Sequence, residues 1–316
     1  MNIKSIVVRQ EFDLFSSGIL HGNYPQIDLF QLGAGAIQGW LISARIGSYR
    51  VSIGSFNRTL LYEGHYNPEM LHIGFLLHTG NSAMVLGHNY DADNFSMDLG
   101  YIPVHGVLQA NSVWANIYAP ERVIMTGVQY SRKKMKLSPH LMIGNSRKKL
   151  IPITQFLNKL MSSPNGSWNI NETDMASRLQ YALHNLLATS FKTEIYGQPF
   201  AKGDMFQMSL LKKLHELSRM YRTQPLSLGE ICNDVGMKQR TLQKYFHELY
   251  GMGPTEYFRL RRLNGAHTDL LKGTPKVSDV AAHWKFTHLG RFSGSYKTLF
   301  GESPKTTRER MWLFGL

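Results

Sequence analysis

The stretch "SDVAAHWKFTHLGRFSGSYKTLFG", residues 278–301, decides the fold of the C-terminal part of the chain. It begins with a short segment carrying Ala281 and Ala282, and after a break it places Phe292, Tyr296 and Phe300 at four-residue steps. Residues four apart lie on one face of a helix, so these aromatic residues predict a helix anchored by one face. Small residues in the preceding segment let two helices cross closely at a steep angle. The stretch therefore predicts a helix-turn-helix unit.

A second stretch with the same plan, "LSLGEICNDVGMKQRTLQKYFHELYGMGP", covers residues 226–254. Ile231 and Cys232 stand where the first stretch has its two alanines, and Gly236 suits a turn that needs positive φ. Each second helix is followed by glycine and, three residues later, by proline: Gly251 and Pro254 in one stretch, Gly301 and Pro304 at the end of the other. The sequence therefore predicts two helix-turn-helix units about fifty residues apart.

The charge of the chain points to a polyanionic partner. The formal net charge is +13 and the pI is about 9.7. From residue 201 onward there are 19 basic and 10 acidic residues, whereas residues 1–200 hold 16 basic and 12 acidic residues. The basic surplus is thus concentrated in the part with the two predicted units, which favours DNA over an ordinary helical bundle.

The face opposite each apolar stripe supplies the candidate DNA contacts. Arg240 and Arg291 suit bidentate contacts to guanine, and Gln243 suits adenine. The remaining candidates are expected mainly on phosphates, with a solvated face as the open alternative for each lysine. The full candidate set is Lys238, Gln239, Arg240, Gln243, Lys244 and His247 in the first unit, and Lys285, His288, Arg291, Ser295 and Lys297 in the second.

Several spaced motifs in residues 205–310 resemble those of the AraC/XylS transcription regulators. "FGESP", residues 300–304, is similar to the family's F-G-x-S-P, and "RLRRLNGAHTDLL", residues 259–271, is similar to the R-L-x-x-A-x-x-L-L of its central helix. "YGMGPTEYF", residues 250–258, resembles G-x-S-P-x-x-Y with Gly253 in place of serine. The resemblance implies a double-stranded DNA partner, with two helices entering successive major grooves about 34 Å apart. It also implies a homodimer and contact with RNA polymerase.

Three departures from the family pattern bear on how the units grip DNA. Lys285 stands where glycine is usual, so a left-handed conformation there would cost about 1 kcal/mol. Cys232 occupies a usual alanine position. Gly290 and Gly294 lie inside the second recognition helix, at about 1 kcal/mol each relative to alanine. We therefore expect the sequence-specific grip to rest more on the first unit.

The sequence pattern of the N-terminal half differs from that of the C-terminal half. Residues 39–56 and 70–78 combine β-branched and aromatic residues with frequent glycines, which predicts short strands of a barrel or sandwich, with residues 87–95 as a turn-rich insertion. Residues 150–164 predict a helix with Pro152 in its first turn. Residues 171–189 predict another, capped by Asn171. Its apolar stripe can pair with a second chain or pack onto its own barrel.

The predicted fold class is α+β with several domains. "GQPFAKGD", residues 197–204, marks the boundary between the two textures. We expect a β-rich effector-binding domain over residues 1–170, which the resemblance suggests is a cupin-like barrel or sandwich. A dimerisation helix and linker over residues 171–200 and a DNA-binding domain over residues 201–316 follow.

Clustered arginines and lysines make an anionic small-molecule effector one option. Arg9, Arg45, Arg50 and Arg58 fall on or near predicted strands, and a basic cluster between residues 132 and 149 includes Arg132, Lys133 and Lys134. For that cluster a solvated loop, a DNA-backbone contact and an anion dock all remain open. No H-x-H motif occurs, so neither a metal nor another cofactor is expected.

The leading function is a ligand-responsive transcription regulator, and within that class an activator. An effector-independent regulator, controlled by abundance or a protein partner, is the alternative. A DNA-repair enzyme with an appended helix-turn-helix domain is a third class, but the chain lacks G-x-S-x-G, H-E-x-x-H and Walker motifs and its one thiol, Cys232, is at a helix-packing position. The lone cysteine and the lack of a signal-peptide pattern favour the cytoplasm.

Overall fold

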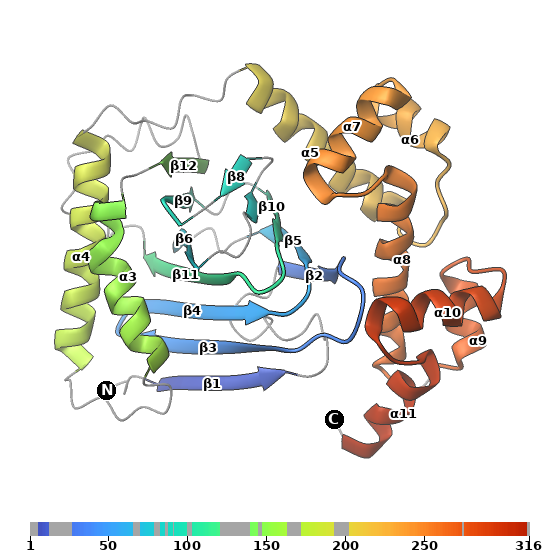
Figure 1. The fold of residues 1–316 in the computed structure, drawn as a ribbon, viewed down its shortest axis with the longest axis horizontal. Helices are drawn as coiled ribbons and strands as arrows, with labels where there is room; N and C mark the ends of the chain where they lie inside the picture. The colour runs from blue at the N-terminus through green and yellow to red at the C-terminus, as the bar shows by residue number, and fades with distance from the viewer. Residues whose placement is uncertain are drawn as a thin grey trace.

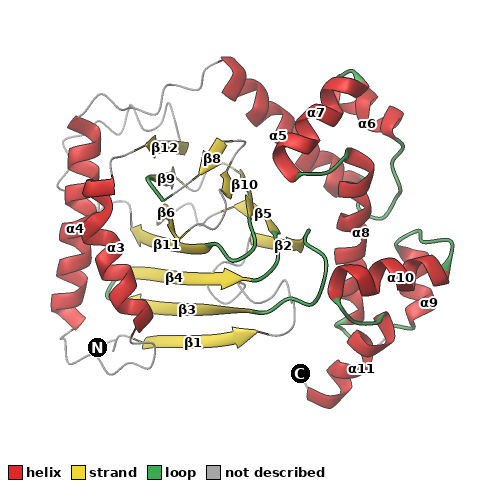
Figure 2. Ribbon diagram, in the orientation of Figure 1, coloured by secondary structure: helices red, strands yellow, loops and turns green. Residues whose placement is uncertain are grey.

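The computed structural model describes residues 6–12, 27–65, 70–78, 83–85, 88–90, 92–99, 103–120, 140–144, 147–162, 172–192, 202–273 and 275–314. Strands occupy most of the first half of the chain and helices the second (Figure 2). The mixed α+β fold predicted from the sequence is therefore confirmed.

The strands form two antiparallel sheets. The larger sheet has the order β1 (Ile6–Phe12), β3 (Gly39–Ile46), β4 (Tyr49–Phe56), β11 (Val113–Pro120), β6 (Met70–His78), β9 (Asn94–Leu99) and β12 (His140–Gly144). The smaller has the order β2 (Ile27–Gln31), β5 (Leu60–His65), β10 (Pro103–Leu108), β7 (Ala83–Val85) and β8 (His88–Tyr90). Each sheet has two free edges within the described residues, so these strands form no closed barrel. Of the barrel and the sandwich that the sequence left open, the cupin-like barrel is therefore not confirmed.

Two helices cover the larger sheet on the side away from the C-terminus (Figure 1). They are α3 (Arg147–Ser162) and α4 (Glu172–Lys192). Leu157 and Leu183 on these helices join one buried cluster with Ile53, Ile73 and Ile117 of the sheet. The stripe on α4 therefore packs onto its own sheet, which decides between the two readings that the sequence left open.

Three local predictions in this half need correction or fall outside the described residues. The helix predicted from residue 150 begins at Arg147, so Pro152 lies within it, beyond the first turn. The segment expected to be a turn-rich insertion contains β8 and the start of β9. Asn171, the predicted cap of α4, and residues 197–201 of the predicted boundary lie outside the described residues, while residues 202–204 already belong to α5.

The C-terminal half consists of helices stacked beside the smaller sheet (Figure 1). They are α5 (Lys202–Met220), α6 (Leu228–Val235), α7 (Gln239–Tyr250), α8 (Pro254–Leu270), α9 (Val277–His283), α10 (Leu289–Phe300) and α11 (Pro304–Phe314). Their buried residues form one hydrophobic cluster with residues of β2, β5 and β10. The helices therefore share a continuous core with the sheet beside them.

Candidate nucleic-acid interface

Helices α6 and α7 form the first helix-turn-helix unit, called unit 1 here. Ser227 caps α6 in a capping box, in which its hydroxyl accepts from the Glu230 amide at 3.2 Å and the Glu230 carboxylate accepts from the Ser227 amide at 2.7 Å. Gly236 ends α6 in the left-handed region at φ 73°. Leu242 and Phe246 are fully buried and hold α7 by one face.

Helices α9 and α10 form the second unit, called unit 2. Lys285 takes the place of Gly236 in the turn, and it adopts the left-handed conformation at φ 58°. Arg262 of α8 supports this turn, because its Nη1 donates to the carbonyl oxygen of Trp284 at 3.1 Å and its guanidinium lies 4.7 Å from the centre of the Phe286 ring. The turn therefore keeps the geometry of a helix-turn-helix unit without a glycine.

The predicted DNA contacts lie on the open faces of both units. Arg240 and Arg291 are exposed and form no ion pair or hydrogen bond with any residue that the structure describes. Lys244 is exposed and lies 3.7 Å from Glu248, a surface pair too weak to prevent a phosphate contact. Of the whole predicted set, Ser295 alone is half-buried, and the exposed members are Lys238, Gln239, Arg240, Gln243, Lys244, His247, Lys285, His288, Arg291 and Lys297.

The first turns of α7 and α10 also suit phosphate. Their N-cap residues, Lys238 and His288, make no side-chain capping hydrogen bond, and neither first turn contains an acidic residue. The amide groups there keep their capacity to donate to an anion, and the helix dipole favours negative charge at the same place. In α6, by contrast, the capping box already occupies the Glu230 amide, and an acidic side chain stands in the first turn.

Helix α8 is joined to unit 2 and to α11 by polar contacts of its buried face. His267 on α8 lies 2.6 Å from the Tyr296 hydroxyl of α10, which donates to Thr307 of α11 at 2.8 Å. Thr307 in turn donates to the Glu302 carboxylate at 2.7 Å. This chain is satisfied from end to end, so it fixes α10 and α11 relative to α8.

The residues that hold the helices on the N-terminal strands were not among those predicted from the sequence. Asn264 of α8 accepts from the Gln31 amide at 2.7 Å and donates to the Gln31 carbonyl at 2.9 Å. The Gln31 side chain donates to Leu299 at the end of α10, and the Gly35 amide donates to Thr298 at 2.9 Å. Asn264 occupies an apolar-stripe position of its helix, and that was the one signal available in the sequence.

A buried charged cluster forms the other part of this contact. Glu63 of β5 is 2% exposed, and its Oε1 lies 2.6 Å from Arg261 Nη2 and 3.5 Å from His215 Nδ1. Burial opposes ionisation of Glu63, but the charge of Arg261 and the hydrogen bonds from His215 and Arg261 outweigh it and hold the pKa of that carboxyl far below its usual range. His105 of β10 contacts the Tyr250 hydroxyl at 2.7 Å, and burial lowers the pKa of His105 to about 4.

The residues predicted for an anionic effector are spread over the N-terminal sheet. Arg45 and Arg50 are cross-strand neighbours at one end of β3 and β4, and both are exposed. Arg58 follows the opposite end of β4, where its Nη1 donates to the Asn57 carbonyl at 3.1 Å. Arg9 lies on β1 opposite Ile42. The structure thus brings Arg45 and Arg50 together and separates them from Arg58, while Arg132, Lys133 and Lys134 lie outside the described residues.

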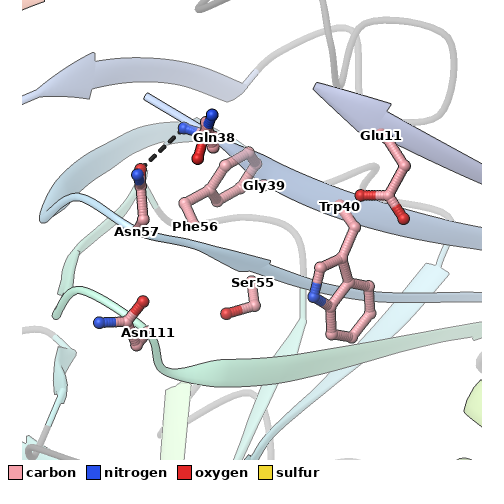
Figure 3. Close-up of a pocket in the computed structure, with 8 residues that line it drawn as sticks. All are labelled: Glu11, Gln38, Gly39, Trp40, Ser55, Phe56, Asn57 and Asn111. Atoms are coloured by element: carbon pink, nitrogen blue, oxygen red, sulfur yellow. Dashed lines mark hydrogen bonds between the residues drawn. The ribbon is translucent and has the colours of Figure 1, made fainter. Parts of the chain in front are cut away.

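A hollow of about 670 Å³ opens at the ends of β3 and β4 (Figure 3). Trp40 and Phe56 form its apolar wall, and Glu11 is the charged residue among the described residues that line it. Among the described residues no arginine or lysine lines it, so Arg9, Arg45, Arg50 and Arg58 are not part of this hollow.

Comparison with known proteins places the helical half in a family. A family model described as a helix-turn-helix domain matches residues 231–310. The HTH-type transcriptional activator AarP of Providencia stuartii is 30% identical over 107 residues, which cover 34% of this chain and 79% of AarP. The chain belongs to the AraC/XylS family of transcription regulators.

Other relatives of this AraC/XylS chain match over the same region. The probable thc operon regulatory protein of Rhodococcus erythropolis is 38% identical over 84 residues, which cover 26% of this chain and a quarter (25%) of that protein. The chain thus matches well under two thirds of the length of this relative. Among solved structures, the AraC-like transcriptional activator CuxR is 14% identical with a TM-score of 0.45, covering 84% of this chain and 96% of CuxR.

The described residues contain neither a membrane-spanning helix nor a cluster of metal ligands. None of the described helices is both long and apolar enough to cross a membrane. No group of three or more His, Cys, Asp or Glu side chains in the described part of the chain is placed to hold a metal ion.

Proposed function

We propose that this chain is a sequence-specific DNA-binding transcription activator that places α7 and α10 in neighbouring major-groove segments of one site. The observation that carries the proposal is the pair of units with exposed, unpaired Arg240 and Arg291, joined by the single helix α8. Exposed lysines around them supply phosphate contacts. A relative named as an activator, AarP, supports the sign of regulation, and RNA polymerase is then the further protein partner.

We propose in addition that the chain divides near residue 200. Residues 1–170 would bind an effector, residues 171–200 would support dimerisation, and residues 201–316 would bind DNA. Because the stripe of α4 is buried against the sheet, a homodimer would use the outer face of α3 and α4, where Ile151 is 44% and Tyr181 is 69% exposed. Light scattering on Tyr181→Glu tests this, and an unchanged mass would remove that surface from the proposal.

Binding to DNA tests the main proposal. A preferred duplex is first selected from random sequences, and affinity is then measured by fluorescence anisotropy for that duplex and for a random one. Arg240→Ala is expected to weaken binding to the preferred duplex by about 1–3 kcal/mol and to affect random DNA less. Lys244→Ala is expected to weaken both duplexes alike, because a phosphate contact carries no sequence information.

The control and the salt response complete the experiment. Arg178→Ala removes an exposed arginine of α4 and is expected to leave both affinities unchanged. Affinity for random DNA should fall steeply as salt rises, since neutralised phosphates release counterions. Equal losses for Arg240→Ala on the two duplexes, or an affinity independent of salt, would contradict the proposal.

A further inference from the structure

Corresponding positions in the two recognition helices, α7 and α10, lie fifty residues apart. Helix α7 begins three residues after Gly236, whereas α10 begins four residues after Lys285. The spacing of 49 positions between Gly236 and Lys285 therefore becomes fifty within the helices, and the buried Leu242 and Phe292 keep it. The outward faces of the two helices can thus be compared position by position.

The outward face of α10 is bare where that of α7 is charged. Gly290 corresponds to Arg240, and Gly294 corresponds to Lys244. Both glycines are exposed, and a Cβ at either position would meet no described atom outside its own stretch of helix within 4 Å. Glycine weakens a helix and here fills no space in the protein, but it lets the backbone of α10 come close to another surface.

Leu289, the first residue of α10, is an exposed apolar residue beside this bare face. Its spacing to Phe292 is that of a buried stripe, yet Leu289 is 49% exposed while Phe292 is 1% exposed. Side chains of a helix tilt toward its N-terminus, so that of Leu289 projects past the start of α10 and beyond the core beneath the helix. In a helix-turn-helix unit, the residues at this end of the recognition helix reach the base edges.

The contacts with the N-terminal strands hold the other end of α10. The Gly35 amide donates to the carbonyl oxygens of Thr298 and Leu299 at 2.9 Å and 3.0 Å, and the side chain of Gln31 also donates to Leu299. All three hydrogen bonds end in the last turn of the helix. The first turn, with Leu289 and Arg291, is exposed among the described residues and so is accessible to DNA.

A leucine at this position matches one feature of a base pair. Thymine carries a methyl group in the major groove, and side chains that contact this group are apolar. Leucine has no side-chain donor or acceptor, so it cannot read the hydrogen-bonding edges that distinguish the other bases. Because Leu289 and Arg291 are two residues apart in one turn, their contacts should fall on neighbouring base pairs.

We propose that Leu289 is a specificity-determining residue of unit 2, whose side chain packs on the C5-methyl group of a thymine while Gly290 and Gly294 let α10 approach the floor of the groove. The proposal rests on the proposed function, because it requires α10 in a major groove. At the corresponding position α7 carries Gln239, so the two units should read different bases there.

The test removes the methyl group from the DNA and the leucine from the full chain. Each thymine of the selected duplex is replaced in turn by deoxyuridine, which keeps the hydrogen-bonding edge and lacks only the methyl group, and Kd is measured by fluorescence anisotropy. For the native chain, one thymine next to the base pair at which Arg291→Ala loses preference should show a roughly fourfold higher Kd after replacement, as for one apolar carbon returned to water.

Variants at Leu289 assign this effect to the side chain. In Leu289→Ala the same replacement should leave Kd unchanged, because the apolar contact is already lost. Leu289→Met keeps an apolar side chain of similar size and should keep the discrimination between thymine and deoxyuridine. Because Leu289 is exposed, both variants should unfold at the Tm of the native chain.

Met220→Ala is the matched control. Met220 is 76% exposed at the end of α5, outside both units, so its truncation removes an exposed apolar side chain without changing α10. The fourfold discrimination should remain in this variant.

Two results would overturn the proposal. They are the absence of any thymine in the segment read by unit 2 at which deoxyuridine weakens binding, and an equal discrimination in Leu289→Ala and the native chain. The proposed function stands in both cases as long as Arg240→Ala and Arg291→Ala lose base-pair preference. If those two variants keep the preference of the native chain, the proposed function fails instead, so the two failures are distinguishable.

Discussion

Unit 1 and unit 2 follow one plan with different closing residues. Lys285 stands 49 positions after Gly236, and both adopt positive φ, at 58° and 73°. At the same spacing Arg262 corresponds to Lys213. Arg262 donates to the carbonyl oxygen of Trp284, just after α9, at 3.1 Å. Lys213 donates to the carbonyl oxygen of Val235, at the end of α6, at 3.2 Å. The same backbone geometry is thus reached with glycine in one unit and with a supported lysine in the other.

The residues that fill the helix crossing differ more strongly. Val235 of unit 1 corresponds to Trp284 of unit 2. In the helix that precedes each unit, Glu216 of α5 corresponds to Gly265 of α8. The large ring of Trp284 fits only because Gly265 leaves room for it. Unit 2 is therefore the more tightly fitted unit, while the recognition helices differ in charge pattern: α7 carries Arg240, Lys244 and Glu248, and α10 carries Arg291 and Lys297.

Gly265→Ala should break this comparison with the largest effect. The added Cβ overlaps the Trp284 ring, and overpacking of this kind costs about 3 kcal/mol in free energy of unfolding. Glu216→Ala, at the equivalent exposed position before unit 1, should change stability by no more than about 0.5 kcal/mol. Urea denaturation measures both variants.

The double variant Gly265→Ala with Trp284→Val gives unit 2 the smaller residue of unit 1. It should be more stable than the sum of the two single changes, because each change relieves the other. Strict additivity would show that the two positions do not share one space.

Acidification should affect the contact that holds unit 1 on the N-terminal strands and spare the contact that holds unit 2. Tyr250 of unit 1 contacts His105, whose pKa is lowered to about 4 by burial, while Leu299 of unit 2 is held by Gln31, which does not titrate. The unfolded chain therefore binds a proton at His105 between about pH 6.5 and pH 4 that the folded chain excludes. Stability should fall by about 2 kcal/mol between pH 7 and pH 5.

His105→Gln is the matched variant, since glutamine still offers a polar group to Tyr250. Its stability should fall less over the same pH range in urea denaturation. Because the pKa of Glu63 is lowered, the stability that Glu63 contributes is lost only as the pH falls below the ordinary pKa of a glutamate. That loss lies outside the range from pH 7 to pH 5. An identical pH dependence in the wild type and the variant would contradict the role of His105.

The smallest predicted effect concerns the turns. Lys285→Gly should stabilise the chain by about 1 kcal/mol, because glycine adopts the left-handed conformation without strain. Gly236→Ala should destabilise it by a similar amount for the opposite reason. Thermal unfolding measures both, and a destabilising Lys285→Gly would mean that the side chain of Lys285 contributes more than its strain costs.

Much of the helical half was predictable from the sequence, and the reason is local. Positions such as Leu242, Phe246, Phe292 and Tyr296 recur at helical spacing, so their burial and the exposure of the opposite face follow from period alone. Alignment of the two units placed Lys285 at the turn position of Gly236, and Lys285 adopts the left-handed conformation considered for that position.

The contacts between the halves were not predictable. Asn264 pairs with Gln31 across 233 positions, and Glu63 on β5 meets Arg261 on α8. Neither pair produces a periodic pattern in the sequence, because each depends on how a strand and a distant helix meet in three dimensions. The strand pattern predicted a barrel or a sandwich without choosing between them, because such a pattern does not determine how the strands close.

The most direct test of the account is a map of base-pair preference across the selected site for Arg240→Ala and Arg291→Ala. Affinity is measured for every single base-pair change with each variant. The account predicts that Arg240→Ala loses preference at one base pair, and that Arg291→Ala loses a weaker preference about one helical turn, or 10 base pairs, away. Loss at the same base pair in both variants, or at none, would contradict the claim that the two units read neighbouring segments of one site.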